Sequence, residues 1–351
     1  VSEWTAGTFA AVNDLLVSFL LGFVGEAAHV PFATVNTSGL SGAFPFVYYA
    51  GLTGLFAPNR WNIIKKLLFI ILAGATLLVY MGLFQKDDVG LSVTVIDVGQ
   101  GDAVLVRFPN GRNLLIDGGP KSLTYDAGER IVAPYLRRVG VDRIDALAIS
   151  HPHSDHLGGV EYLAKEFEVG TIYEASEGVV SGMHNSLRNT MASEGIRKKI
   201  VGAGEIIDID PNARVYLMNP LLGDDTSDNL NNLSIVMKIT YGSTSMFLPG
   251  DAEAETEEMV RRMFGDFLDS DILKVGHHGS STSSTDEFLD GITPDIAIIS
   301  VGTKNKFHHP SPEVVRKLKD RDVALYRTDR DGAIVLESDG HRFRRIQWRS
   351  P

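Results

Sequence analysis

The sequence predicts a layered α/β domain preceded by transmembrane or membrane-associated helices, and three observations support this prediction. Up to residue 88 the chain is apolar with few charges, and within that part the run 67–84 has eighteen residues without a charge. From Leu91 onward, short strand-like runs alternate with helical ones, which is typical of a layered α/β domain. We therefore expect a membrane segment over residues 1–88 and a globular domain over residues 89–351.

The apolar run 67–84 is close to the minimum length that crosses a bilayer. Basic residues gather before it and the acidic pair Asp87 and Asp88 lies after it, so the positive-inside rule places the globular domain on the extracytoplasmic side. Two weaker stretches, 9–25 and 42–57, could be spans, re-entrant pieces or interfacial helices, and buried core helices are the alternative. Because the chain begins with Val1 and lacks a signal-peptide pattern, we expect a fragment of a multi-pass cell-membrane protein.

The charge balance limits the partners. The chain carries 44 acidic and 33 basic residues, for a net charge of −11. A protein that binds nucleic acid over a broad surface usually clusters Lys and Arg, so any contact with a polyanion must be local, metal-assisted or transient. The closing hairpin has one compact basic patch, for which a solvated strand face is the stronger interpretation, at Arg342, Arg344 and Arg345. The absence of cysteine decides nothing about the compartment.

The globular domain begins with strands. The run "LSVTVIDVGQGDAVLVRF" reads as strand, glycine-containing turn and strand, and "NLLIDGG" is a further strand that ends at Asp117. A helix is expected across "GERIVAPYLRRVG", followed by the buried strand "IDALAIS". Sites in layered α/β proteins gather where strands end, so we expect chemistry in the loop after this strand.

That loop reads "SHPHSDHLGG" and holds three of the ten histidines of the chain. His151 and His153 are two residues apart and can face one cation, while Asp155 and His156 can face a second cation beside it. Imidazole and carboxylate groups together suit zinc, manganese or iron. The alternative is a polar loop in which Asp155 caps a helix that starts at Leu157.

Two later strand ends supply further ligand types. "SMFLPGD" ends at Asp251, whose carboxylate could bridge two metals, and "DILKVGHHGS" ends at His277 and His278. One of these two histidines could support a ligand rather than be one. Ordinary strand-end turns are the alternative for both motifs.

The ordered set of motifs resembles the metallo-β-lactamase fold and, more narrowly, the C-terminal domain of ComEC-type competence proteins. The stretches that carry this resemblance are "DVGQGDAVLV", "LLIDGG", "NNLSIVMKITYGSTSMFLPGD", "LKVGHHGS" and "HHPSPEVVRKL". The resemblance implies an αββα sandwich with two divalent metal ions, zinc or manganese, that acts as a nuclease during DNA uptake. It implies single-stranded DNA as substrate, and the membrane, the rest of the channel and other uptake proteins as partners.

One departure affects the expected metal sites. The wider fold usually presents another histidine where this chain reads "NLNNLS", so Asn231 or Asn232 takes that place. An amide oxygen is a poorer metal ligand than imidazole. We therefore expect a weak site at His151 and His153, and a full one at Asp155, His156, Asp251 and one of His277 and His278.

The mechanism that follows is metal-assisted hydrolysis of a phosphodiester, in which an activated water attacks phosphorus. We expect Asp155 to be catalytic, and His278 or His309 to protonate the departing oxygen. His309 precedes a helix start at Ser311, although simple loop placement explains it equally well. Residues expected to line the substrate are Gln100, Asp102, Asp117, Asn231, Asn232 and Ser280.

Three functions stay open at this point. The first is a membrane-tethered phosphodiesterase of single-stranded DNA. The second is a hydrolase of the same fold that acts on another phosphoester or on a lactone. The third is a non-hydrolytic module that guides DNA.

Overall fold

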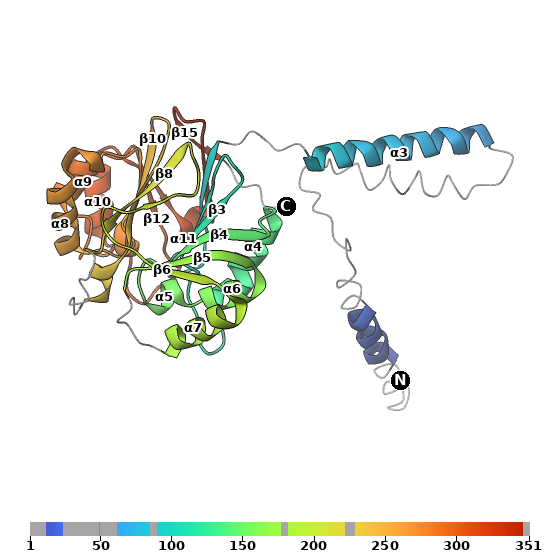
Figure 1. The fold of residues 1–351 in the computed structure, drawn as a ribbon, viewed down its shortest axis with the longest axis horizontal. Coiled ribbons are helices and arrows are strands. Elements are labelled where there is room, and N and C mark those ends of the chain that lie inside the picture. The colour runs from blue at the N-terminus through green and yellow to red at the C-terminus, as the bar shows by residue number, and fades with distance from the viewer. Residues whose placement is uncertain are drawn as a thin grey trace, which may run out of the picture. The chain divides into compact units, whose positions relative to one another are not determined.

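The computed structural model describes residues 12–23, 49, 62–84, 90–176, 182–221 and 229–346. The chain divides into two compact units, residues 1–85 and residues 86–351, each described here by itself. In the first unit, residues 12–23 are helical and α3 covers Asn62–Phe84 (Figure 1).

The first unit differs from the sequence prediction in one respect. The run 67–84 is helical as expected, but α3 starts earlier and includes Lys65 and Lys66. Across the described part of the chain, no helix combines the length and the apolar character needed to cross a membrane. Most of the predicted stretch 42–57 lies outside the described residues.

The second unit contains two mixed sheets. The first has the strand order β15-β14-β1-β2-β3-β4-β5-β6. It is antiparallel from β15 to β3 and parallel from β3 to β6. Its strands are β1 Leu91–Val95, β2 Val104–Arg107, β3 Asn113–Ile116, β4 Arg143–Ala148, β5 Glu168–Glu174, β6 Arg197–Ile200, β14 Ile334–Ser338 and β15 Phe343–Ile346.

The second sheet has the order β13-β12-β11-β10-β9-β8-β7. Strands β7 to β10 are antiparallel, and β10 to β13 are parallel. Its strands are β7 Ile206–Ile207, β8 Ala213–Asn219, β9 Val236–Tyr241, β10 Thr244–Leu248, β11 Ile272–Lys274, β12 Ile296–Ile299 and β13 Ala324–Arg327.

Helices cover the outer face of each sheet (Figure 1). Against the first sheet lie η2 Gly128–Val132, α4 Ala133–Arg138, α5 Ser154–Leu157, α6 Val160–Glu166 and α7 Gly182–Glu194. Against the second lie α8 Ala254–Phe264, η4 Gly265–Leu268, α9 Asp286–Ile292 and α10 Pro312–Asp320. Short turns complete the unit: η3 Leu230–Leu233, η5 Gly276–Gly279 and α11 Thr328–Asp331.

The layers follow from the alternation of side chains along each strand. In β2, Val104 and Val106 belong to the core between the sheets, whereas Leu105 belongs to the core under the helices of the first sheet. In β10, Met246 faces the central core and Phe247 the outer one. Successive strand residues point to opposite faces, so both sheets are buried on both sides. The predicted αββα sandwich is confirmed.

Candidate metal centre

The loop after β4 is anchored by Asp117, the residue that follows β3. One carboxylate oxygen of Asp117 accepts a hydrogen bond from the Ser150 amide at 2.7 Å, and the other accepts from the Ser150 hydroxyl at 2.7 Å. The second oxygen also lies 2.8 Å from Nδ1 of His156. Asp117 has a left-handed backbone, with φ of 63°, which is rare for a residue other than glycine. The contact between Asp117 and Nδ1 of His156 fixes the ring of His156 and leaves its Nε2 for other partners.

Four side chains meet where β10, β11 and the β4 loop converge: Asp155, His156, Asp251 and His278. Their ligand atoms all lie within 4.8 Å of one another. Oδ2 of Asp251 is 3.2 Å from Nε2 of His156 and 3.5 Å from Nε2 of His278. Oδ2 of Asp155 is 3.5 Å from the same His278 nitrogen. Asp155 is 30% exposed and the other three are buried, so the group has one open side.

Several atoms of this group lack hydrogen bonds. Among the described residues, Nε2 of His156, Nε2 of His278 and Oδ1 of Asp251 are buried and have no hydrogen-bond partner. Buried polar atoms without partners destabilise a protein unless something else compensates them. Neutral imidazole nitrogens and carboxylate oxygens are the donor atoms that zinc and manganese accept. The group therefore fits a divalent cation.

Charge acts strongly on the same residues. Burial lowers the pKa of His156, but the charges of Asp251 and Asp117 outweigh it and raise that pKa well above its ordinary value. Burial raises the pKa of Asp251, but His156 and His278 outweigh it and hold that pKa well below its ordinary value. The carboxylates of this site thus stabilise positive charge placed beside them.

The structure separates His277 from His278. Nδ1 of His278 donates to the Ser300 carbonyl at 2.9 Å, which aims Nε2 at Asp251. His277 is partly exposed, with Nδ1 3.2 Å from the Glu253 carboxylate and 3.2 Å from the Thr282 hydroxyl. Both histidines have left-handed backbones, with φ of 47° and 53°. Such strain is often stored at functional sites.

The two histidines expected at a weaker cation site contact each other. Nε2 of His151 lies 3.0 Å from Nδ1 of His153, and Nδ1 of His151 lies 3.1 Å from the Ser150 hydroxyl. Nε2 of His151 is 3.9 Å from Asp251. Burial and the neighbouring His156 lower the pKa of His151 well below its ordinary value. A second cation here stays a prediction.

The two asparagines of "NLNNLS" have different surroundings. Asn231 is buried; its amide donates to Glu253 at 3.0 Å and its Oδ1 has no hydrogen-bond partner within the described chain. Asn232 instead accepts from the Glu253 amide at 3.1 Å and donates to Glu255 at 3.2 Å, at the start of α8. Asn231 is therefore the one with an amide oxygen to offer, and Asn232 holds the helix start.

Asp102 and Asp117 both lie buried beside the histidines of the group. Asp102 is buried, forms an ion pair with Lys274 and lies 3.6 Å from Nδ1 of His278. Burial lowers the pKa of Lys274, but the charge of Asp102 outweighs it and raises that pKa. Both aspartates thus support the histidines, and their predicted contact with substrate stays a prediction.

Lys274 and Glu253 were missed by the sequence prediction. Lys274 is the last residue of β11, and alternation places it on the same face as Ile272, inside the sandwich. The signal in the sequence that could have indicated Lys274 is its place at the end of an otherwise apolar strand. Glu253 follows Asp251 by two residues and holds Asn229, Asn231 and His277 together.

The remaining predicted residues surround the group. Oε1 of Gln100 accepts from the Gly302 amide at 3.3 Å. Ser280 is buried, and its hydroxyl lies 3.0 Å from that of Thr282. His309 is half-buried, with its ring centroid 5.7 Å from that of His277. Of these, only His309 and the partly exposed Gln100 are open to solvent.

Comparison with known proteins agrees with this architecture. Residues 96–303, more than half of the chain, match the Metallo-beta-lactamase superfamily. The chain belongs to the metallo-beta-lactamase superfamily. The solved structure of the metallo-beta-lactamase fold protein YhfI from Bacillus subtilis is 12% identical, with a TM-score of 0.48 over 71% of this chain and 100% of that one.

Two curated relatives are more similar in sequence. The chain is 28% identical to "ComE operon protein 3" of Bacillus subtilis (strain 168), over 92% of this chain and 42% of that protein. It is 32% identical to "Competence protein ComA" of Neisseria gonorrhoeae, over 69% of this chain and 32% of that protein. The chain spans less than half the length of these relatives. The likeness to ComEC-type competence proteins is confirmed.

Proposed function

We propose that this metallo-beta-lactamase domain is a metal-dependent phosphodiesterase that cleaves single-stranded DNA during uptake. The observation that carries the proposal is the buried group of two imidazoles and two carboxylates whose facing atoms lack hydrogen bonds. The likeness to competence proteins supports DNA as the substrate.

Asp155, His156, Asp251 and His278 would hold one divalent cation, zinc or manganese, and His151 and His153 with Asp251 would hold a second. When bound, such cations polarise the phosphoryl oxygens and lower the pKa of water toward neutrality. Either metal suits this set, because it combines imidazole with carboxylate.

The chain's own residues orient the donor atoms. Asp117 holds Nδ1 of His156 and the Ser300 carbonyl holds Nδ1 of His278, so each ring presents its Nε2 to the group. The partly exposed Asp155 marks the side from which a phosphodiester reaches it. Such supporting contacts fix the ring orientation and the tautomer.

His309 is the better candidate for the acid that protonates the departing 3′-oxygen. Nδ1 of His278 already donates to the Ser300 carbonyl, and its Nε2 faces Asp251. The ring nitrogens of His309 make no hydrogen bond within the described residues, and its ring lies beside His277 at the open side. An acid must reach the leaving oxygen within hydrogen-bond distance, which a half-buried loop residue at the open side can do.

Attachment to a membrane on its extracytoplasmic side is also part of the proposal. Attachment rests on the uncharged run 67–84 of the sequence, and the side rests on the basic residues that precede this run. Extraction of membranes from cells that express the whole chain tests it: retention of the chain after an alkaline wash is expected, and full release would contradict it.

The decisive experiment measures hydrolysis and metal content together. Purified chain is assayed on labelled single-stranded DNA with manganese or zinc, and elemental analysis gives the bound metal. We expect Asp155→Ala and Asp251→Ala to abolish cleavage and to lower the metal content, because each removes a carboxylate from the group. Asp266→Ala, a surface carboxylate on η4, is the matched control and should change neither.

The same assay separates the alternatives. Wild-type rates in both variants would remove the catalytic role of the group. Hydrolysis of lactones or small phosphoesters without DNA cleavage would favour another substrate. Metal-independent DNA binding without any hydrolysis would favour a guiding module. Circular dichroism of each variant shows whether the fold is kept.

A further inference from the structure

We propose that Phe307, with Lys304 and Lys306, forms a nucleotide subsite in which a base of single-stranded DNA stacks on the Phe307 ring beside the metal centre. This inference rests on the proposed function and deepens it, since it names the part of the substrate that is recognised outside the reacting phosphate. None of the three residues belongs to the donor group.

The exposure of Phe307 is the first observation. Its side chain is 53% exposed, and among the described residues of 90–346 only one other phenylalanine, Phe267, is classed with the exposed large apolar residues. A single exposed apolar residue is common on protein surfaces. Its position and its neighbours must therefore carry the argument.

The position of Phe307 connects it to the metal centre. Its ring is nearly parallel to that of His309, with 5.8 Å between centroids and 15° between planes. The His309 ring lies 5.7 Å from that of His277, whose Nε2 is 3.9 Å from Asp251. A row of rings thus runs from solvent to the donor group. Because only the sugar separates a base from its phosphate, a base stacked here places a neighbouring phosphate near that group.

The loop that carries Phe307 is held in place. The side chain of Asn305 donates to the carbonyls of His309 and Gly302 at 2.7 and 3.0 Å, and it accepts from the His309 amide at 2.9 Å. The start of the loop packs on the 99–102 turn so closely that a Cβ at Gly302 would lie 2.7 Å from the Gln100 nitrogen. A preorganised platform loses little conformational entropy when it binds.

The charge around Phe307 suits a phosphate backbone. Lys304 and Lys306 are exposed, and Nζ of Lys306 lies 5.1 Å from the centre of the Phe307 ring. Neither lysine forms an ion pair with a described residue. No acidic residue occurs from Val301 to Pro312, although the chain as a whole has a net charge of −11. Aromatic side chains on which bases stack, beside basic side chains that contact the backbone, are how proteins bind single strands without reading sequence.

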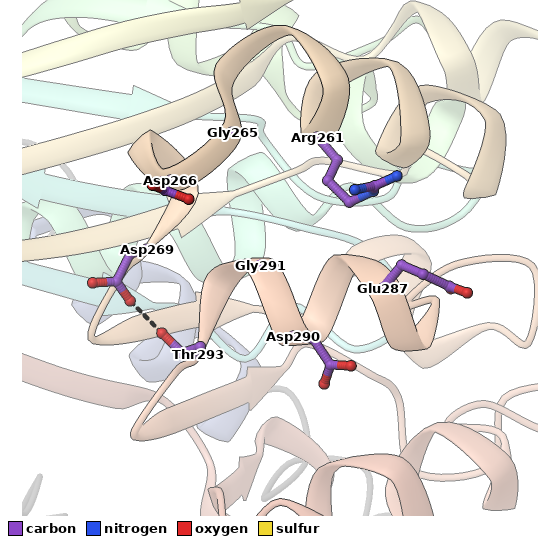
Figure 2. Close-up of a pocket in the computed structure, with 8 residues that line it drawn as sticks. All are labelled: Arg261, Gly265, Asp266, Asp269, Glu287, Asp290, Gly291 and Thr293. Carbon is purple, nitrogen blue, oxygen red and sulfur yellow. Dashed lines mark hydrogen bonds between the residues drawn. The ribbon is translucent and has the colours of Figure 1, made fainter.

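Phe267 is an exposed ring without a path to the metal centre and without exposed lysines. The lysine beside it, Lys238, has Nζ 4.7 Å from the ring centre, but it is buried and donates to the carbonyls of Phe267 and Asp269. Phe267 is 41% exposed, and its ring packs edge-on against Tyr216 with 5.0 Å between centroids. Its neighbours Asp266 and Asp269 line an open hollow between α8, η4 and α9 (Figure 2). Carboxylates repel phosphates, so Phe267 is the matched control.

The test measures binding of the full chain to labelled single strands in the presence of a chelator, so that cleavage is not required. Two oligonucleotides of equal length are compared, one of thymidine and one of abasic sites. Stacking on an aromatic side chain contributes about 1–3 kcal/mol per base, or roughly 5- to 150-fold in affinity. We expect Phe307→Ala to lose affinity in that range for the thymidine strand and to leave abasic binding unchanged.

Further variants of the aromatic and basic residues sharpen the result. Phe307→Trp should keep the affinity, because it keeps a π-face, and Phe267→Ala should bind like wild type. Lys304→Gln and Lys306→Gln should each reduce the salt dependence of log affinity by about 0.7, the value expected for one phosphate contact on a single strand. Lys165→Gln, an exposed lysine on α6, is the control for charge alone.

Unchanged thymidine binding in Phe307→Ala, or an equal loss on abasic strands, would overturn the stacking subsite. These outcomes differ from failure of the proposed function. A chain that never cleaves DNA yet shows base-dependent binding through Phe307 would keep the subsite and lose the nuclease. If Phe307→Ala cleaves DNA as fast as wild type at limiting DNA concentration, the nuclease is kept and the subsite is lost.

Discussion

Two regions of the second unit concentrate carboxylates, and they differ in almost every other respect. One is the group at the ends of β10 and β11. The other is a hollow of about 690 Å³ between α8, η4 and α9, whose lining includes Asp266, Asp269, Glu287, Asp290 and Arg261 (Figure 2). Figure 2 shows these side chains spread along the walls of the hollow rather than converging.

The partners of the carboxylates explain the difference. In the hollow, the Asp290 side chain is 66% exposed and pairs with Arg321 at 2.7 Å, and Asp269 accepts from the Thr293 hydroxyl. At the sheet ends, the Asp251 side chain is 3% exposed, lies among four imidazoles and keeps one oxygen without a hydrogen bond among the described residues. A density of acidic residues therefore does not mark a metal site; buried donor atoms that lack partners do.

The largest expected effect concerns Lys274, the buried lysine that forms an ion pair with Asp102. Lys274→Met leaves Asp102 buried without its ion-pair partner, and removal of one partner of a buried pair typically costs about 3–5 kcal/mol. We expect the free energy of unfolding in urea to fall by about that amount. Arg261→Met, which removes the basic residue from the lining of the hollow, should leave it almost unchanged, because its pair with Glu258 is exposed.

A double variant decides whether the pair or the volume of Lys274 is responsible. Lys274→Met with Asp102→Asn removes both charges and should recover most of the lost stability. If the double variant is as unstable as the single one, the ion pair is not the cause. An unaffected single variant would contradict the burial of this pair.

The second effect concerns metal binding. A ligand that binds only the folded state stabilises it by about 2.7 kcal/mol at one hundred times its dissociation constant. We expect manganese or zinc to raise the melting temperature of the wild type, and Asp251→Asn to abolish that rise. Asp266→Asn with Asp269→Asn should keep it. If the rise in melting temperature survives in Asp251→Asn but is lost in Asp266→Asn with Asp269→Asn, the metal binds in the hollow and not at the ends of β10 and β11.

Much of this site could be predicted from the sequence because strand ends are visible in it. Asp117, His151, Asp251 and His278 each follow an apolar run that forms a strand, and parallel strands bring such ends to one edge. The histidine loop, the Gly-Asp end of β10 and the sandwich were all predictable on this basis.

Other features depend on contacts between distant residues. The choice of His278 over His277 follows from the Ser300 carbonyl on β12's end, 22 residues away. The inward position of Asp102 depends on Lys274, which belongs to the other sheet. Local sequence patterns carry no information on such pairs, so the contacts of Asp102 and Asp117 with Lys274 and His156 could not be predicted.

The smallest expected effect concerns a third kind of carboxylate, buried behind the hollow. Glu257 accepts from the Ser284 and Thr285 amides and the Thr285 hydroxyl, with Lys317 nearby, yet burial outweighs these contacts and raises its pKa above the ordinary 4.5. Between pH 4.5 and that raised value the folded state binds more protons than the unfolded state, so the free energy of unfolding falls as pH rises through this window. Glu257→Gln should remove this contribution to the slope, measured as wild type minus variant in urea unfolding at several pH values. Glu287→Gln, on the wall of the hollow, should leave the slope as it is. A wild-type slope in Glu257→Gln would mean that this carboxylate is as well solvated as those of the hollow, and burial would then no longer distinguish it from them.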